Sequence, residues 1–496
     1  MSTSDIRVEP EAALDPLVLA IDVGSTASRG GLYDAAGRPV RGLRHKVPHQ
    51  FTTATDGTSQ IDPDQVVREV EAILTAVATD GLAGRIAGVA MDTFASSLVG
   101  VDGEGRALTP CFTYADSRCA PQVVALRQEM DERAVQQRTG TRLHTSYLPA
   151  RLRWLRESTP ETFAAVDRWL SLGEYIYLQL LGTTAVGTST AAWTGLLDRR
   201  TGAWDAELLM ACRVRPEQFS EIRDPDRPLD AGAAVGRRWP ALAGTRWFPV
   251  ITDGFASNVG GGAADESTIA AAAATSGAMR VLAHGIPDEI PPGLWCYRVD
   301  SSRSLLGGAL NDVGRVLTWL GATVQMPDDA DLGAALSAAP DAATPVVLPF
   351  LTGERSTGWA ANARAVVTGV SVATTPTMLV RGAMEGVAIA YARVAGQLEQ
   401  AAGRPQRIVA SGRVTQDLPS WLQVLADAIG APVHHVTMKR TTLRGTALVA
   451  LEVLAPEVPR APVETGGTYE PVPGRAEYYA GRKDRFEELY DAVIDR

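Results

Sequence analysis

Two segments of the 496-residue chain share a pattern that restricts the fold: each is a turn of small residues rich in hydroxyl groups, one in either half of the chain. In the first half the strand Leu17–Asp22 enters the turn Gly24–Arg29, and Gly31–Asp34 is the predicted return strand. In the second half the corresponding turn is Thr275-Ser276-Gly277-Ala278. A duplicated fold with one such loop per half would produce this pattern.

Strands and helices alternate after the first hairpin. A helix is predicted with Asp62 as its N-cap and Pro63 at its first position. Its apolar face follows the three- and four-residue spacing of Val66, Val70, Ile73 and Val77. Ile86–Met91 is the next predicted strand, and it ends in Asp92. These features predict an α/β fold with mixed sheets flanked by helices.

The chain is predicted to divide near its middle. Residues Glu217–Trp247 are rich in Pro, Asp and Arg and show weak periodicity, which is typical of a loop-rich connection. The strand pattern restarts at Phe248–Thr252. We therefore expect two domains, residues 1–248 and residues 249–496.

Composition excludes several classes of protein. Lys and Arg number 47 against 57 Asp and Glu, and this acidic balance argues against a nucleic-acid partner. Only three lysines are present (Lys46, Lys439 and Lys483), and none follows a glycine, so the usual P-loop is excluded.

The chain also lacks the sequence signs of export or membrane insertion. The acidic segment Met1–Pro16 does not resemble a targeting peptide, and no apolar run is long enough to span a membrane. The four cysteines show no metal-ligand spacing. We expect a cytoplasmic protein with reduced thiols and no membrane partner.

The first turn combines groups that suit phosphate binding. Its backbone amides and hydroxyls can bind phosphate oxygens, Arg29 adds a positive charge, and Asp22 can hold Mg²⁺ or its waters. Taken alone, a tight hairpin with solvated hydroxyls is the simpler interpretation.

Other segments are equally ambiguous when taken singly. Asp253 ends a strand before small residues, which suits a catalytic base or a helix-capping turn. Ser411-Gly412-Arg413 lies between a strand and a helix, an arrangement that often receives a nucleotide. Asp116 and Arg118 could bind adjacent hydroxyls or a carboxylate, or form a surface ion pair.

In this order, the segments resemble the FGGY carbohydrate kinases over residues 17 to about 455. The resemblance rests on nine segments: Asp22–Arg29, Tyr114–Arg118, Asp253–Gly262, Ala274–Arg280, Gly307–Asn311, Pro349–Arg364, Arg381–Gly386, Ser411–Ala426 and Leu443–Ala450. It implies two ribonuclease H-like (actin-like) domains with a cleft between them. ATP would lie mainly against the second domain and the sugar mainly against the first.

The resemblance also implies residue roles. Asp253 matches the general base that takes a proton from the sugar hydroxyl, and the metal would be held at Asp22. The residues implied for the sugar are Ser96, Asp116, Arg118 and Asp253. Those implied for ATP are Gly24, Ser25, Thr26, Ser28, Arg29, Thr275, Ser276, Gly277, Gly308, Asn311, Gly412 and Arg413.

Within the family the chain is most similar to the gluconokinase-like branch, which implies D-gluconate as acceptor and 6-phosphogluconate as product. Three departures bear on this: Ser96 replaces a usual histidine, Ala274 a common glycine, and Arg413 the second glycine of the adenosine motif. The alternatives are a xylulokinase-like kinase of a pentulose or polyol, a catalytically weak sugar sensor, and an actin-like ATPase. A small carbohydrate is the expected partner, and a homodimer stays an open expectation.

Overall fold

The computed structural model describes residues 6–494, which form two compact units. The first unit contains the described residues up to Gly260 together with Cys296–Ser304 and Arg440–Pro462. The second contains Gly261–Trp295, Leu305–Lys439 and the described residues from Val463 onward.

The predicted domain boundary near residue 248 differs from the observed division of the chain. The first unit continues to Gly260 because β14 (Ile251–Thr252) pairs in parallel with β6 (Ile86–Thr93). The late helix α16 (Thr441–Leu454) also belongs to the first unit. Both contacts join residues far apart in the sequence, which a local pattern does not reveal.

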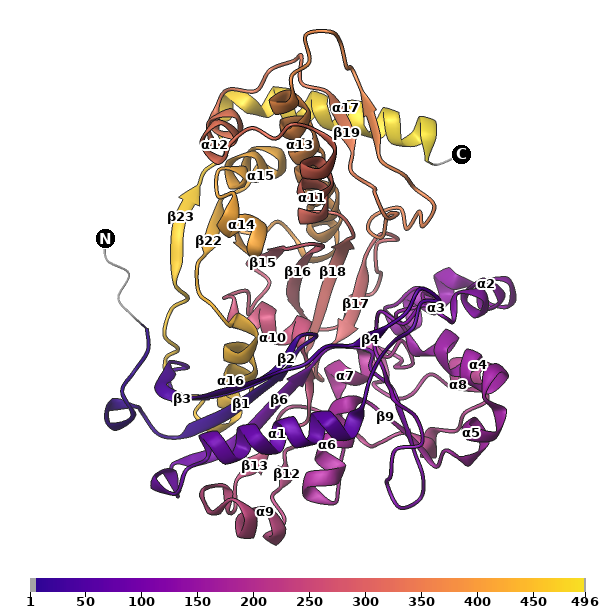
Figure 1. The fold of residues 1–496 in the computed structure, drawn as a ribbon, viewed down its shortest axis with the longest axis vertical. Helices are drawn as coiled ribbons and strands as arrows, with labels where there is room; N and C mark the ends of the chain where they lie inside the picture. Colours follow the sequence, from indigo (N-terminus) through magenta and orange to yellow (C-terminus); the bar gives the residue numbers. More distant parts are fainter. Residues whose placement is uncertain (1–5, 495–496) are drawn as a thin grey trace. The chain divides into compact units, whose positions relative to one another are not determined.

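A mixed sheet forms the centre of the first unit (Figure 1). Strand β1 pairs antiparallel with β2 and parallel with β6. The strand order is β12-β13-β6-β1-β2-β3, and β14 pairs with β6. Apart from β6 and β14, the bounds are β1 (Leu17–Val23), β2 (Ala27–Tyr33), β3 (Pro39–Pro48), β12 (Leu229–Asp230) and β13 (Arg246–Trp247).

Two helices cover opposite faces of this sheet. A Cβ atom at Gly30 would meet Ile73 of α1 (Pro63–Val77), whereas one at the next residue, Gly31, would contact Leu443 of α16. Successive residues of a strand face opposite sides, so α1 and α16 do as well. The predicted start of α1 is confirmed, because the Asp62 side chain accepts a hydrogen bond from the backbone N–H of Asp64.

The first hairpin is tighter than predicted. The N–H of Gly24 donates to the carbonyl of Ala27 (3.1 Å), so the strands already pair at Val23 and Ser28. Ser28 and Arg29 therefore lie in β2 rather than in the turn.

The first unit also contains a helical part with its own hydrophobic core. Its helices are α2 (Ala120–Glu129), α3 (Glu132–Thr139), α4 (Leu148–Ser158), α5 (Pro160–Ala165) and α8 (Ala206–Cys212). The unit's remaining α-helices are α6 (Leu172–Leu181), α7 (Thr188–Trp193), α9 (Ala233–Arg238) and α10 (Asp253–Gly260). Its short strands are β4 (Thr52–Thr53), β5 (Ser59–Ile61), β7 (Val99–Val101), β8 (Cys111–Phe112), β9 (Arg168–Leu170), β10 (Val186–Gly187) and β11 (Ile222–Arg223).

The sheet order β17-β18-β16-β15-β21-β22-β23 repeats the first pattern around the β15–β16 hairpin. As in the first unit, the first strand of that hairpin pairs antiparallel with the second and parallel with a later strand. The bounds are β15 (Thr268–Ala273), β16 (Gly277–His284), β17 (Trp295–Arg298), β18 (Arg303–Leu310), β21 (Arg407–Ser411), β22 (Val433–Val436) and β23 (Thr465–Tyr469). The expectation of an α/β fold with two related halves and mixed sheets is confirmed.

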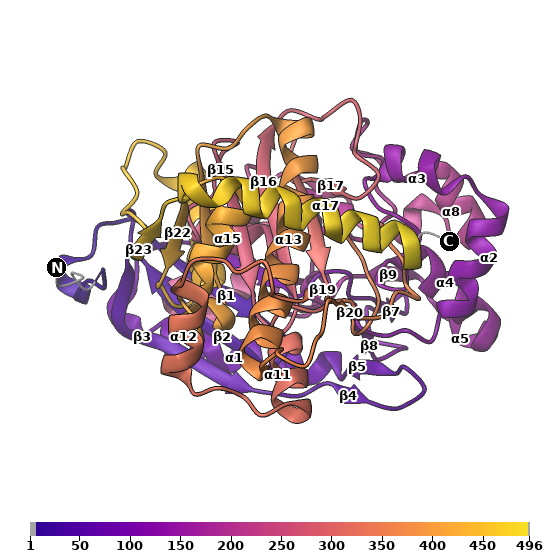
Figure 2. The ribbon, with the colours of Figure 1, turned by 90° about the horizontal axis from the view of Figure 1, so that it is seen from above.

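Helices of the second unit include α17, which runs across α15 and α13 (Figure 2). The α-helices described in this unit are α11 (Gly314–Thr323), α12 (Asp329–Ser337), α13 (Pro376–Ala402), α14 (Arg413–Asp417), α15 (Trp421–Ile429) and α17 (Ala476–Val493). The unit also contains a separate pair of strands, β19 (Val346–Leu348) and β20 (Val366–Thr368).

Two further predictions concern thiols and membrane spans. All four cysteines are buried and unpaired with one another. Across residues 6–494, no helix has both the length and the apolar character that crossing a bilayer requires.

Candidate active site

Three carboxylates lie together in the first unit, where its central strands end. Asp22 and Asp92 are register neighbours on β1 and β6, and Asp92 also neighbours Ile251 of β14. Asp253 follows β14 directly and begins α10. The structure thus brings the predicted metal residue and the predicted base close to a third acid.

The environment of these acids differs from that of surface carboxylates. Burial raises the pKa of Asp22, an effect that the Arg29 guanidinium at 3.1 Å opposes. Asp92 is fully buried, and its pKa is raised well above the ordinary value by burial and then by the charge of Asp22. Thr446 donates to its Oδ2 at 2.5 Å, and its Oδ1 has no hydrogen-bond partner among the described residues.

This donor set fits Mg²⁺. Carboxylate oxygens are the ligands that Mg²⁺ prefers, and the ion is usually bound through one or two carboxylates together with substrate phosphates. In the described part of the chain, no group of three or more His, Cys, Asp or Glu side chains could hold a metal ion by itself. Asp22 and the orphaned oxygen of Asp92 therefore suit an ion that arrives with a phosphate ligand.

A buried histidine contacts the turn of the first hairpin and holds it in place. His49 Nε2 lies 2.8 Å from the carbonyl oxygen of Gly24, and its Nδ1 lies 2.8 Å from Glu69 Oε2. Burial alone would raise the pKa of Glu69, but hydrogen bonds from His49, Ser28 and Gln65 hold it below its ordinary value. The imidazole thus links α1 to the turn.

The predicted phosphate-binding side chains of this hairpin separate into two groups. Ser25 and Thr26 are exposed at the tip of the turn. Ser28 is fully buried, and its hydroxyl donates to Glu69 at 2.7 Å. The Ser28 side chain therefore supports the turn from inside, because the register places it on the buried side of β2. Arg29 is partly exposed and paired with Asp22.

The position of Asp253 is fixed by close packing between α10 and α16. A Cβ atom at Gly445 would come within 1.8 Å of the carbonyl oxygen of Ala256, and one at Gly260 within 1.8 Å of that of Thr441. Asp253 Oδ1 accepts the N–H of Gly254 at 2.8 Å. A carboxylate at a helix N-terminus is favoured in its charged form by the helix dipole, which suits a base.

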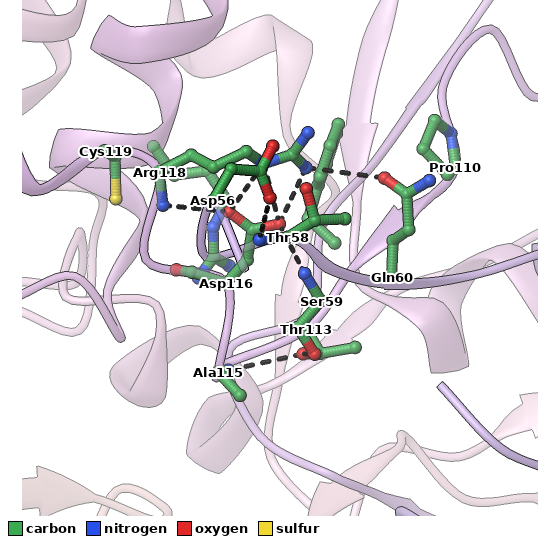
Figure 3. Close-up of polar contacts among 12 residues, drawn as sticks. Asp56, Thr58, Ser59, Gln60, Pro110, Thr113, Ala115, Asp116, Arg118 and Cys119 are labelled. Atoms are coloured by element: carbon green, nitrogen blue, oxygen red, sulfur yellow. Dashed lines mark hydrogen bonds and ion pairs between the residues drawn. The ribbon is translucent and has the colours of Figure 1, made fainter. Parts of the chain in front are cut away.

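Asp116 and Arg118 form a closed pair in the first unit (Figure 3). Arg118 Nη2 lies 2.7 Å from Asp116 Oδ2, and that oxygen also accepts the N–H of Ser59 at 3.0 Å. Asp116 is almost fully buried, whereas Arg118 is partly exposed and packs 4.5 Å over the Trp154 ring. Arg118 is therefore the member of the pair that a substrate can reach.

Ser96 is more constrained than a substrate contact needs to be. It is buried, has a backbone φ of 55°, and its hydroxyl donates to the carbonyl of Trp193 at 2.6 Å. Its own carbonyl accepts from Arg151 at 2.8 Å. Ser96 thus ties its loop to α7 and α4.

In the second unit, the ends of neighbouring strands collect the predicted nucleotide residues. Thr275 and Ser276 are exposed in the β15–β16 turn. The N–H groups of Val313 and Arg315 both donate to the Thr275 carbonyl at 3.2 Å. Gly412 has a φ of 109°, and a Cβ atom there would lie 2.3 Å from the Ala273 carbonyl oxygen, so this approach requires glycine.

Three other predicted nucleotide residues lie nearby in different settings. Gly308 is buried against Val394 and Ser356. The Asn311 side chain donates to the carbonyl of Gly353 (2.9 Å) and accepts from Arg355 (2.8 Å), so it shapes the loop that follows β19. Arg413 is highly exposed and pairs with Asp417. Asn311 also lines a small pocket together with Leu310, Asp312, Pro349, Phe350, Glu354, Arg355, Ser356 and Ala390.

The sequence interpretation missed three residues of the first unit. Asp92 carried a usable signal, since it ends a strand in an acid as Asp22 does. His49 and Arg151 carried none, because the contacts that define their roles, with the Gly24 and Ser96 carbonyls, join segments distant in the sequence.

Comparison with known proteins matches both halves of the chain. The model of the FGGY family of carbohydrate kinases, N-terminal domain, matches residues 17–231, and that of the C-terminal domain matches residues 261–452. Gluconokinase of Bacillus subtilis (strain 168) is 24% identical over 456 residues, 88% of this chain and 87% of that protein. Xylulose kinase of Escherichia coli (strain K12) is 24% identical over 508 residues, 96% of this chain and 99% of that protein.

Solved structures match the whole fold. The gluconate kinase from Lactobacillus acidophilus superimposes with a TM-score of 0.88 at 25% identity, covering 96% of this chain and 98% of that one. The xylulose kinase from Rhodospirillum rubrum gives a TM-score of 0.88 at 24% identity, with 96% and 99% covered.

Proposed function

Since the chain belongs to the FGGY family of carbohydrate kinases, and is thus an ATP-dependent sugar kinase, we propose that its acceptor is a small sugar acid, with D-gluconate first. The resemblance inferred from the motifs is confirmed at the level of the family. Gluconokinases and a gluconate kinase structure are among its relatives, and xylulose and glycerol kinases are as well. The relatives therefore support several acceptors. The choice among these acceptors has to be argued from the residues of the site itself.

The observation that carries the proposed mechanism is the placement of Asp253 at the start of α10, beside Asp22 and Asp92. Asp253 takes the proton of the acceptor hydroxyl as its oxygen attacks the γ-phosphorus of ATP. The bond from that phosphorus to the bridging oxygen breaks, and ADP leaves. Phosphoryl transfer needs little else than positioning and charge stabilisation.

The residues proposed for ATP act through the two turns. In the first unit, the amides and hydroxyls of Ser25 and Thr26 bind phosphate oxygens, and Arg29 adds positive charge. In the second unit, the exposed Thr275–Ser276 segment of the turn and the tightly packed Gly412 are the residues proposed for the nucleotide. Mg²⁺, held at Asp22, would neutralise phosphate charge.

The acceptor is tested by measuring ADP production with D-gluconate, D-xylulose, xylitol, erythritol and glycerol. The highest kcat/KM is expected for D-gluconate. A higher value for a pentulose or polyol would replace the proposed acceptor with the xylulokinase-like alternative. ATP hydrolysis that does not depend on any acceptor would favour the actin-like alternative, and no activity with any acceptor would favour the sensor.

His49 offers a test of the first turn as a phosphate site. The change His49→Gln removes one of the two ring contacts, to Glu69 or to the Gly24 carbonyl. Losing a buried hydrogen bond of about 1 kcal/mol is expected to raise the KM for ATP about fivefold, with the KM for the acceptor little changed. The matched control is His45→Gln on the exposed part of β3, for which both values should stay at the wild-type level. Equal changes in both KM values for His49→Gln would contradict the assignment.

A further inference from the structure

Arg151 of α4 is a fully buried cation that binds three segments of the first unit. Its Nη1 donates to the Ser96 carbonyl at 2.8 Å. Its Nη2 donates to the Thr145 carbonyl at 3.1 Å and lies 3.5 Å from that of Asp116. One guanidinium therefore holds the Ser96 loop and the Asp116–Arg118 loop together.

The charge of Arg151 is not balanced by a carboxylate. Among residues 6–494, no Asp or Glu forms an ion pair with it, and its Nε has no hydrogen-bond partner. Burial lowers the pKa of the guanidinium, but arginine stays protonated in proteins. The nearby carboxylate of Asp116 is already taken by Arg118 at 2.7 Å. These three side chains together carry one excess positive charge.

The surrounding groups leave this excess in place. Asp56 is fully exposed, and its pKa is lowered by hydrogen bonds from Thr58 and, to a smaller extent, by the charge of Arg118. Water and salt screen an exposed charge such as this one, whereas a buried charge is screened far less. The other polar neighbour of Arg118 is the uncharged Gln60, at 3.4 Å (Figure 3).

Arg118 provides the contact through which this charge can act. Its Nε and Nη2 are used by Asp116 and Gln60, but its Nη1 makes no hydrogen bond within the described residues. The side chain is 20% exposed, so this nitrogen can meet a ligand. Without Arg151, the Asp116–Arg118 pair would have no net charge, and the loop would then prefer neither an anionic nor a neutral ligand.

We propose that Arg151 is a specificity-determining residue that makes the acceptor site prefer a carboxylate-bearing sugar over a neutral one. The inference rests on the proposed function, because it takes Arg118 as an acceptor-binding residue. The acceptor carboxylate binds Arg118 Nη1. Arg151, which contacts the backbone of the same loop, supplies the net positive charge. A buried charge in a medium of low dielectric constant acts over several ångströms, so direct contact is not required.

The test compares two acceptors that differ at one carbon. D-gluconate carries a carboxylate where D-glucitol carries an uncharged hydroxymethyl group, and the other hydroxyls correspond. The measured quantity is the ratio of kcat/KM for gluconate to kcat/KM for glucitol. Arg151→Met is expected to lower this ratio about tenfold or more, and Arg151→Lys, which keeps the charge, to keep it within about threefold of wild type.

Two further variants complete the experiment. Arg151→Gln is a second neutral replacement that keeps hydrogen-bond donors, and it should lower the ratio as Met does. Asp56→Asn removes an exposed acid near Arg118 and should raise the ratio less than about threefold. Unfolding temperature and ADP affinity are measured for every variant, so that a folding defect is recognised.

The outcomes separate the inference from the proposed function. Equal losses for both acceptors in all three Arg151 variants, with the ratio unchanged, would mean a purely structural role and would overturn the inference alone. A wild-type enzyme that prefers glucitol would overturn the sugar-acid acceptor itself. That second result stands even when no neutral variant folds.

Discussion

Asp253→Asn is expected to reduce kcat by about 10²- to 10⁴-fold while ADP still binds with nearly wild-type affinity, since loss of a general base typically has an effect of this size. Asparagine keeps the shape of the side chain and can still accept the N–H of Gly254, so α10 should begin as before. It cannot take a proton from the acceptor hydroxyl at neutral pH. Steady-state kinetics with D-gluconate and calorimetric titration with ADP measure the two quantities separately.

The control for Asp253→Asn is the same change at Asp226, an exposed acid in the loop-rich part of the first unit. That variant should keep wild-type kcat. Near-normal turnover by the Asp253 variant would show that another group is the base. A loss of ADP binding together with activity would instead indicate that Asp253 maintains the structure of the site.

Gly445→Ala is expected to destabilise the first unit by about 1–3 kcal/mol or more, the usual range for overpacking a close contact. The added methyl group would lie 1.8 Å from the carbonyl oxygen of Ala256, a backbone atom that cannot rotate away. Helices α16 and α10 would have to separate. Because Asp253 begins α10, we also expect kcat to fall by tenfold or more.

A matched control exists in the second unit. Gly396 lies in the interior of α13, and a Cβ atom there would meet nothing within 4 Å. Gly396→Ala should therefore stabilise the helix by about 0.5–1 kcal/mol, because alanine loses less backbone entropy than glycine. Urea unfolding measures both free energies. Equal stability of the Gly445 variant and wild type would refute the packing account of α10.

The local parts of the fold were predictable from the sequence. The start of α1 at Pro63 follows from a capping acid and a proline, both of which act within one helical turn. The first strand of the hairpin was predicted to within one residue, but its turn was predicted too long, so the return strand was expected to begin at Gly31 and begins at Ala27. The length of that turn depends on the register with β2, which the hydrogen bond from Gly24 to Ala27 decides.

The acidic residues of the candidate site could be predicted from the sequence, whereas the buried residues that hold its turns in place could not. Asp22 and Asp253 follow apolar strands, and the structure brings them together with Asp92. The hydroxyl of Ser28 was expected to face a phosphate, and it is instead buried against Glu69. Whether a strand residue faces outward or inward depends on which helix covers that side of the sheet.

The family, the first hairpin, the hydroxyl-rich turn of each half and the acids at the strand ends could be predicted from the sequence alone, because these are encoded by neighbouring residues and by the order of motifs. That α16 returns to the first unit, where Thr446 donates a hydrogen bond to Asp92 354 positions away, is visible in the folded structure and not in the local sequence. Tertiary contacts also bury Arg151 without an ion-pair partner among residues 6–494. Such contacts join residues distant in the sequence. Folding removes water from the charged groups at these contacts, and their electrostatic interactions become stronger as a result.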